Sequence, residues 1–96
     1  SRNDERSRCE EVTGGILLLK GKTAESLEHF DEAILLAPAD IKKRRRIIQR
    51  MIEAGLDQQA LDLAKTSYAD MPDHYPFKVI ADRLVSEADS AKGTTE

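Results

Sequence analysis

Apolar positions recur every three or four residues along most of the chain, which is the period of an amphipathic helix. In the clearest stretch, 24–36, small and apolar residues keep this spacing: Ala24, Leu27, Phe30, Ala33 and Ile34. Similar patterns predict helices over about 5–19, 41–54, 58–69 and 76–89. No segment alternates with the period of two that a half-buried strand requires. The pattern therefore predicts an all-α fold with five helices.

Glycine and proline divide these helices at a fixed interval. Pro38 and Pro72 are 34 residues apart, and so are Gly21 and Gly55. A shared offset of this size indicates an internal repeat of helix, turn and helix. The turns are only a few residues long, so consecutive helices are expected to pack antiparallel.

The helix ends carry their own signals. Short polar side chains that can cap a helix N-terminus precede three of the segments: Thr23, Asp40 and Asp57. Gly55 fits the left-handed position that follows a helix end, and Pro76 suits a first helical turn. The first helix is the weakest prediction from local propensity, because Gly14 and Gly15 disfavour the helical state.

The repeat resembles the tetratricopeptide repeat. The residues that carry the resemblance lie in the stretch 21–38: Gly21, Ser26, Phe30, Ala33 and Pro38. Gly14 falls where this family has a small residue in the first helix. The second copy keeps Gly55, Ala60 and Pro72, but it has Ala64 at the bulky position and Ile48 where a small residue is usual.

The resemblance implies a short right-handed α-solenoid of antiparallel helix pairs. An N-terminal extension (1–6) would precede two helix pairs (7–38 and 41–72), and a capping helix (73–89) and a disordered tail (90–96) would follow. Two repeats are fewer than the roughly three that such an array usually needs. This shortage favours a dimer or a longer parent array.

Composition excludes several classes of protein. The chain of 96 residues is 40% hydrophobic and 34% charged, which is too apolar for a disordered polyelectrolyte. Its longest uncharged apolar run is Ile16–Leu19, far below the roughly 20 residues of a membrane-spanning helix. We therefore expect no membrane insertion. Cys9 is the only cysteine, which weakly favours a reducing intracellular compartment.

The titratable residues do not form a catalytic or metal-binding motif. His29 and His74 are isolated, and no second ligand follows either at the spacing that zinc sites use. Cys9 has no base beside it that would make it a nucleophile. We expect no enzymatic activity and no cofactor. His29 is instead predicted to form a surface ion pair with Glu25 or Glu32, which lie on the same side of its helix.

The run Lys42–Arg46 is the sharpest electrostatic feature of a chain whose net charge is −3. Successive helical residues turn by about 100°, so the run cannot form one stripe. Arg44 falls within the apolar face and must extend between helices or pair with a buried acid. The rest could form a solvated face beside a protein-binding groove, a nucleic-acid patch or a nuclear-localisation signal. The acidic net charge and the lack of interleaved aromatic residues argue against nucleic acid.

In this family the first helix of each pair lines the concave surface, so the resemblance implies a partner-binding groove. It would be lined by Arg8 and Leu18 from the first helix, Lys42, Arg45, Gln49 and Ile52 from the third, and Val79 and Arg83 from the last. A groove that mixes cations with aliphatic residues would suit an acidic extended segment, or a helix, with an aliphatic anchor.

One subclass of the family clamps the acidic tails of heat-shock chaperones with Lys, Asn and Arg. The clamp positions here hold other residues, so chaperone-tail binding is not expected: Glu11, Gly15, Arg46, Pro76 and Ile80. The alternatives to partner capture are self-association through exposed apolar residues, including the Ile16–Leu19 run, and electrostatic binding of nucleic acid.

Overall fold

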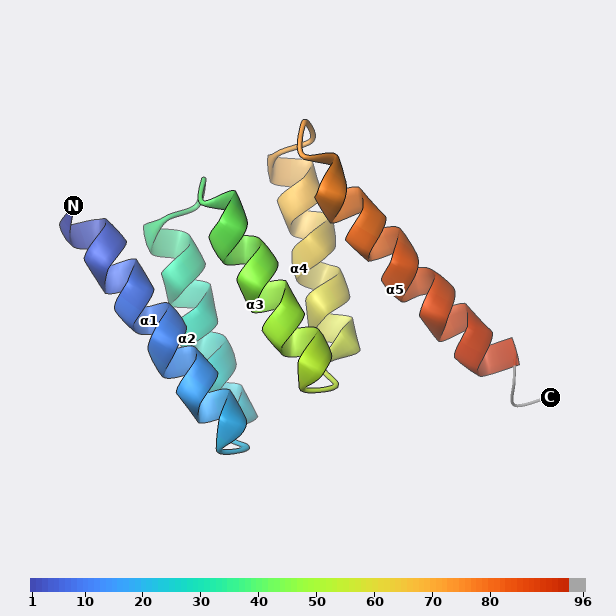
Figure 1. Cartoon of the computed structure of the whole chain (residues 1–96), viewed down its shortest axis with the longest axis horizontal. Coiled ribbons are helices and arrows are strands. Elements are labelled where there is room, and N and C mark those ends of the chain that lie inside the picture. The colour runs from blue at the N-terminus through green and yellow to red at the C-terminus, as the bar shows by residue number, and fades with distance from the viewer. Residues whose placement is uncertain (94–96) are drawn as a thin grey trace. The chain divides into compact units, whose positions relative to one another are not determined.

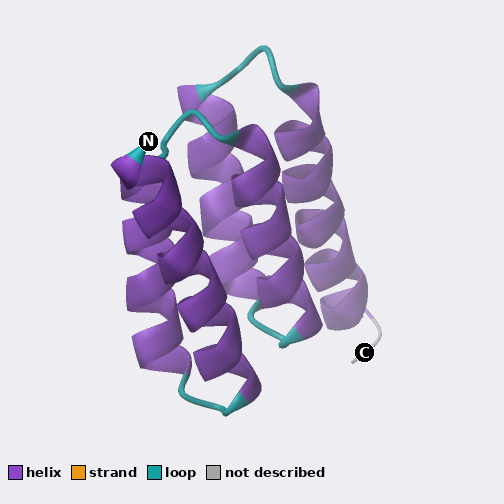
Figure 2. Cartoon of the chain, turned by 60° about the vertical axis from the view of Figure 1, so that its left-hand side comes forward, coloured by secondary structure: helices purple, strands orange, loops and turns teal. Residues whose placement is uncertain are grey.

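The computed structural model describes the backbone of residues 1–93 and the side chains of residues 1–90. This part of the chain forms five α-helices and no strand, so the predicted all-α class is confirmed (Figures 1 and 2). The helices are α1 (Arg2–Leu19), α2 (Thr23–Leu36), α3 (Ile41–Glu53), α4 (Asp57–Asp70) and α5 (Tyr75–Gly93).

The two ends of the chain are more helical than the sequence predicts. Helix α1 begins at Arg2 rather than near residue 5, because the Ser1 hydroxyl accepts the Asp4 amide and caps the helix. The segment 1–6 is therefore almost entirely part of α1. Helix α5 continues to Gly93, so residues 90–93 do not form the expected frayed tail. Residues 94–96 of that predicted tail lie outside the described residues.

The chain divides into two compact units, Ser1–Arg50 and Met51–Glu96, with the boundary inside α3. In the first unit α1 and α2 form an antiparallel pair (Figure 1). Its buried apolar side chains are Phe30, Ala33, Ile47 and Ile48. In the second unit α4 packs on α5, and the buried apolar side chains are Met51, Ala60, Ala64, Phe77, Ala81 and Leu84.

The 34-residue offset is visible in the backbone as well as in the sequence. Gly21 and Gly55 both have φ of +79°. After each glycine, the next amide closes the preceding helix: Lys22 N donates to Leu17 O, and Leu56 N donates to Met51 O. Together with the glycine amides, these bonds make a Schellman motif that satisfies the last carbonyls of α1 and of α3. Each unit therefore contains the same turn.

The predicted N-caps are partly correct. Asp40 caps α3 as expected, because its Oδ1 accepts the Lys43 amide at 3.0 Å. The predictions for Thr23 and Asp57 are wrong by one position, since both are already helical and the caps are Lys22 and Leu56. Neither of these two caps makes a side-chain hydrogen bond. Asp57 still favours its helix, because its charge lies in the first turn.

Candidate protein-interaction surface

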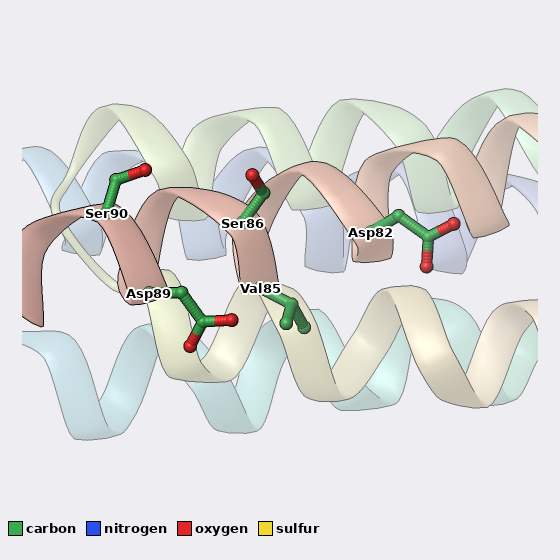
Figure 3. A pocket seen from close by; sticks show the side chains of 5 residues that line it. All are labelled: Asp82, Val85, Ser86, Asp89 and Ser90. Atoms are coloured by element: carbon green, nitrogen blue, oxygen red, sulfur yellow. The ribbon is translucent and has the colours of Figure 1, made fainter. Parts of the chain in front are cut away.

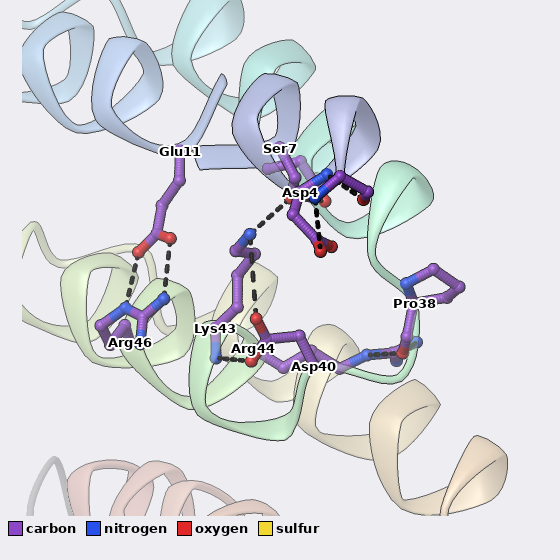
Figure 4. A network of polar contacts seen from close by, with 10 residues as sticks. Asp4, Ser7, Glu11, Pro38, Asp40, Lys43, Arg44 and Arg46 are labelled. Carbon is purple, nitrogen blue, oxygen red and sulfur yellow. Dashed lines mark hydrogen bonds and ion pairs between the residues drawn. The ribbon is translucent and has the colours of Figure 1, made fainter. Parts of the chain in front are cut away.

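The first unit contains a polar seam between α1 and α3 (Figure 4). At one end Ser7, which is fully buried, donates to the Ala33 carbonyl of α2 at 2.6 Å. The same hydroxyl accepts a hydrogen bond from Lys43 Nζ at 2.5 Å. Lys43 is only 5% exposed, and Asp40 Oδ2 lies 3.9 Å from its ammonium. Ser7 thereby links all three helices of this unit.

One turn further along the seam, Glu11 and Arg46 form a two-pronged ion pair. Arg46 Nε and Nη2 donate to the two carboxylate oxygens of Glu11 at 2.8 and 2.9 Å. The Glu11 side chain is 8% exposed, whereas that of Arg46 is 51% exposed. Hydrogen bonding to Glu11 raises the pKa of Arg46, against the opposing effect of desolvation. Arg46 therefore stays charged, and it neutralises a carboxylate that would be costly to bury alone.

The next turn of the seam is formed by a glycine. A Cβ atom placed on Gly15 would lie 3.1 Å from Nη1 of Arg50 and 3.4 Å from its Cζ. The missing side chain thus leaves room for the guanidinium of Arg50 against α1. Three cationic side chains of α3 therefore lie side by side along α1: Lys43 at Ser7, Arg46 at Glu11 and Arg50 at Gly15.

Arg44 lies on the other side of α3, as its position on the apolar face predicts. It is 4% exposed, and its Nε and Nη2 donate to the Pro38 carbonyl at 3.1 and 2.7 Å. These bonds hold the guanidinium against the turn between α2 and α3. Arg44 is therefore part of the interior and is not available to a partner.

Helical geometry shows which residues flank the seam on its open side. Arg8 follows Ser7 in the chain, so its side chain is rotated by about 100° from that of Ser7 about the axis of α1. Lys42 precedes Lys43, so its side chain is rotated by about 100° from that of Lys43 in the opposite sense about the axis of α3. Because α1 and α3 run parallel, these opposite rotations bring both side chains to the same side of the seam. This side faces away from α2, since Gly14 and Glu10 lie on the α2 side of α1.

We call this surface the basic face and define it by five residues: Arg8, Lys42, Arg45, Arg46 and Gln49. All five are exposed. Arg46 is held by Glu11, whereas Arg8, Lys42 and Arg45 have no acidic partner among the described residues. Three unpaired cations therefore meet the solvent on one side of a domain that is acidic overall.

The predicted site residues are distributed over both units. In the first unit Arg8, Lys42, Arg45 and Gln49 lie on the basic face, and Leu18 is half-buried. In the second unit Ile52 is half-buried, Val79 is 50% exposed, and Arg83 lies 3.4 Å from Glu87. Val79 and Arg83 are one helical turn apart on α5, so they share a side of that helix.

Sequence reasoning missed the pairing of Arg46 with Glu11 and the placement of Arg50 over Gly15. Both contacts join residues 35 positions apart, and local helical spacing carries no signal for them. His29 is also corrected: its Nδ1 lies 2.6 Å from Glu10 Oε2 on α1, rather than pairing with Glu25 or Glu32. A contact between helices thus replaces the expected contact within one helix.

A depression on α5 is lined only by exposed residues of that helix: Asp82, Val85, Ser86, Asp89 and Ser90 (Figure 3). Its Asp82 is already bonded to Lys78 Nζ at 2.7 Å. Within the described part of the chain, no three His, Cys, Asp or Glu side chains gather as metal ligands would. In the same part, no helix combines the length and the apolar character that spanning a bilayer requires.

No protein-family model, curated protein or solved structure matches this chain. The residues of the basic face and their surroundings are therefore the features from which a function can be inferred.

Proposed function

We propose that this chain is a non-catalytic protein-interaction module of the tetratricopeptide-repeat type, an adaptor that binds an acidic segment of a partner. The segment, extended or helical, would lie along the basic face, with an aliphatic anchor against Leu18. One observation carries the proposal: Arg8, Lys42 and Arg45 are exposed and unpaired beside a seam that holds them in register.

The seam supports binding because it fixes the backbone under these side chains. Two charged contacts and one glycine contact set the position of α3 against α1. A partner that approaches the basic face therefore meets preset cations, and less conformational entropy is lost on binding. Complementary charge on the partner would raise the association rate and select against basic segments.

Nucleic acid is the runner-up for the same surface. The described residues of the basic face include no aromatic side chain on which a base could stack, and the chain carries a net charge of −3. Backbone phosphates could still bind to Lys42 and Arg45 through charge alone. The test below therefore includes a nucleic-acid arm.

The test measures binding of two fluorescent probes to the full chain by anisotropy. One probe is a 12-residue peptide of Asp and Glu with two Leu residues, and the other is a single-stranded oligothymidine. The double variant Lys42→Glu/Arg45→Glu is compared with Lys20→Glu/Lys65→Glu, which changes the net charge equally at exposed positions elsewhere. The first variant should weaken peptide binding by about tenfold or more, and the second by no more than about threefold.

Equal weakening by both variants would show that only net charge matters and would refute the proposed surface. Tighter binding of the oligothymidine than of the peptide, with a steep dependence on salt, would favour the nucleic-acid function instead. Helical circular dichroism of every variant should match that of the unmodified chain, because all four side chains are exposed.

A further inference from the structure

Helix α1 exposes a set of large aliphatic side chains that the basic face does not use. Val12 is 53% exposed, Ile16 is 49% exposed and Leu19 is 87% exposed. Cys9 is also exposed and has a free thiol. Aliphatic side chains left open in this number on one helix indicate a surface that another helix covers.

The spacing of these four residues is that of a two-helix seam. Positions 9, 12, 16 and 19 are separated by three, four and three residues, which is the alternation of a coiled-coil interface. We call these four residues the outer seam of α1. Two other sides of α1 are already occupied, because Ser7 and Glu11 contact α3, and a Cβ on Gly14 would meet Phe30 of α2.

We propose that the outer seam pairs with the same seam of a second copy of this chain, antiparallel across a two-fold axis. This arrangement places Val12 against Ile16 of the partner subunit, and Cys9 against Leu19 of the partner subunit. All four apolar positions are then covered at once, and each copy supplies the same surface, as a two-fold interface requires.

The charges on α1 select the antiparallel orientation over the parallel one. One step N-terminal to the outer seam, the same spacing reaches Glu5 and then Arg2, and both residues are exposed. A parallel pair would set each of these against its own copy, and like charges placed in this way repel. In the antiparallel pair Glu5 extends beyond the end of the partner helix at residue 19, so its carboxylate stays in water.

The extent of the outer seam predicts weak association. Each copy contributes four residues to the outer seam, far fewer than the roughly 20–30 residues a side of a standard stable interface. We therefore expect a dimer that forms with a dissociation constant on the order of 100 μM. Arg8 of the basic face lies one helical turn from Val12 of the outer seam, so capture of an acidic segment is tested at Lys42 and Arg45 of α3, apart from dimer formation.

The first test is sedimentation equilibrium of the full chain from about 10 μM to 1 mM. The average mass should rise toward that of a dimer, and Ile16→Glu should keep the chain monomeric at every concentration. The control is Leu35→Glu, which adds the same charge at an exposed aliphatic position of α2 (73% exposed) and should leave the mass curve unchanged. A monomer at all concentrations, or the same loss in both variants, would overturn the proposal. Retained peptide binding by Ile16→Glu would separate this outcome from failure of the proposed function.

The second test fixes the orientation with Leu19→Cys, oxidised by diamide, which accepts the two thiol hydrogens as the disulfide forms. The antiparallel pair predicts a disulfide between Cys9 and position 19 of the other copy, mapped by peptide mass spectrometry. The unmodified chain should remain uncrosslinked, since its two Cys9 thiols lie at opposite ends of the interface. A disulfide between the two Cys9 residues would overturn the antiparallel arrangement.

Discussion

Adjacent glycines in α1 should respond in opposite ways to the same substitution. Gly14 and Gly15 both lie inside the helix and are both buried, so an alanine at either position gains about 0.8–1 kcal/mol of helix propensity. Their surroundings differ. A Cβ on Gly14 would lie 2.7 and 2.8 Å from two ring carbons of Phe30, whereas a Cβ on Gly15 would meet the end of Arg50 at 3.1 Å.

The change in stability at each position depends on whether the neighbouring side chain, Phe30 or Arg50, can move away from the added Cβ. Phe30 has no exposed surface, so its ring can retreat only by disturbing the core, and overpacking of this kind costs about 1–3 kcal/mol. Arg50 is exposed, and its guanidinium can shift by a few tenths of an ångström at little cost. We therefore expect Gly15→Ala to stabilise the protein by about 0.5–1 kcal/mol. Gly14→Ala should destabilise it by about 1 kcal/mol, because the overpacking exceeds the gain in propensity.

The assay is urea denaturation followed by helical circular dichroism, with both variants measured beside the unmodified chain. The propensity gain cancels between the two variants, so their difference of about 1–3 kcal/mol reports the contacts of a Cβ at position 14 with the Phe30 ring and with the Ser26 carbonyl, which would lie 3.2 Å away. In a domain of this size such a gap corresponds to at least about 4 °C in Tm.

A shortened partner side chain provides the internal check. In the background of Phe30→Leu, the cost of Gly14→Ala should fall, giving a coupling of about 1 kcal/mol in the double-mutant cycle. If Gly14→Ala proves as stable as Gly15→Ala, or if the cycle shows no coupling, then the close approach of α1 to Phe30 is refuted.

The polar seam gives two further predictions, both measured as free energies of unfolding in urea. Arg46→Ala should lower the free energy of unfolding by about 3–5 kcal/mol, because it leaves the Glu11 carboxylate buried without its partner. Glu11→Ala should lower it by only about 1–2 kcal/mol, because Arg46 can rehydrate. Equal costs for the two variants would contradict this asymmetry. Ser7→Ala should cost about 2–3 kcal/mol, because it removes a hydrogen-bond partner of the buried ammonium of Lys43. Ser26→Ala should cost only about 1 kcal/mol, because it removes a single hydrogen bond to the Gly14 carbonyl. The reverse order would show that Lys43 does not depend on the Ser7 hydroxyl.

Local spacing predicted the helices and most of their ends. The 3–4 residue period located all five helices, and the paired glycines located two identical turns whose left-handed φ of +79° favours glycine. Caps were harder to place, because a shift of one residue moves a side chain out of reach of the amides it would satisfy. Thr23 and Asp57 show this shift, whereas Asp40 lies at the right position.

The sequence by itself determined the all-α class, the 34-residue repeat, the position of Arg44 on the apolar face of its helix and the number of charged side chains on α1 and α3. Only the tertiary structure decided which of those charges are free. The contacts of Glu11 with Arg46 and of Ser7 with Lys43 join helices that are far apart along the chain, so no local pattern encodes them. They form because α2 brings α3 beside α1. The same packing leaves Arg8, Lys42 and Arg45 exposed and unpaired among the described residues.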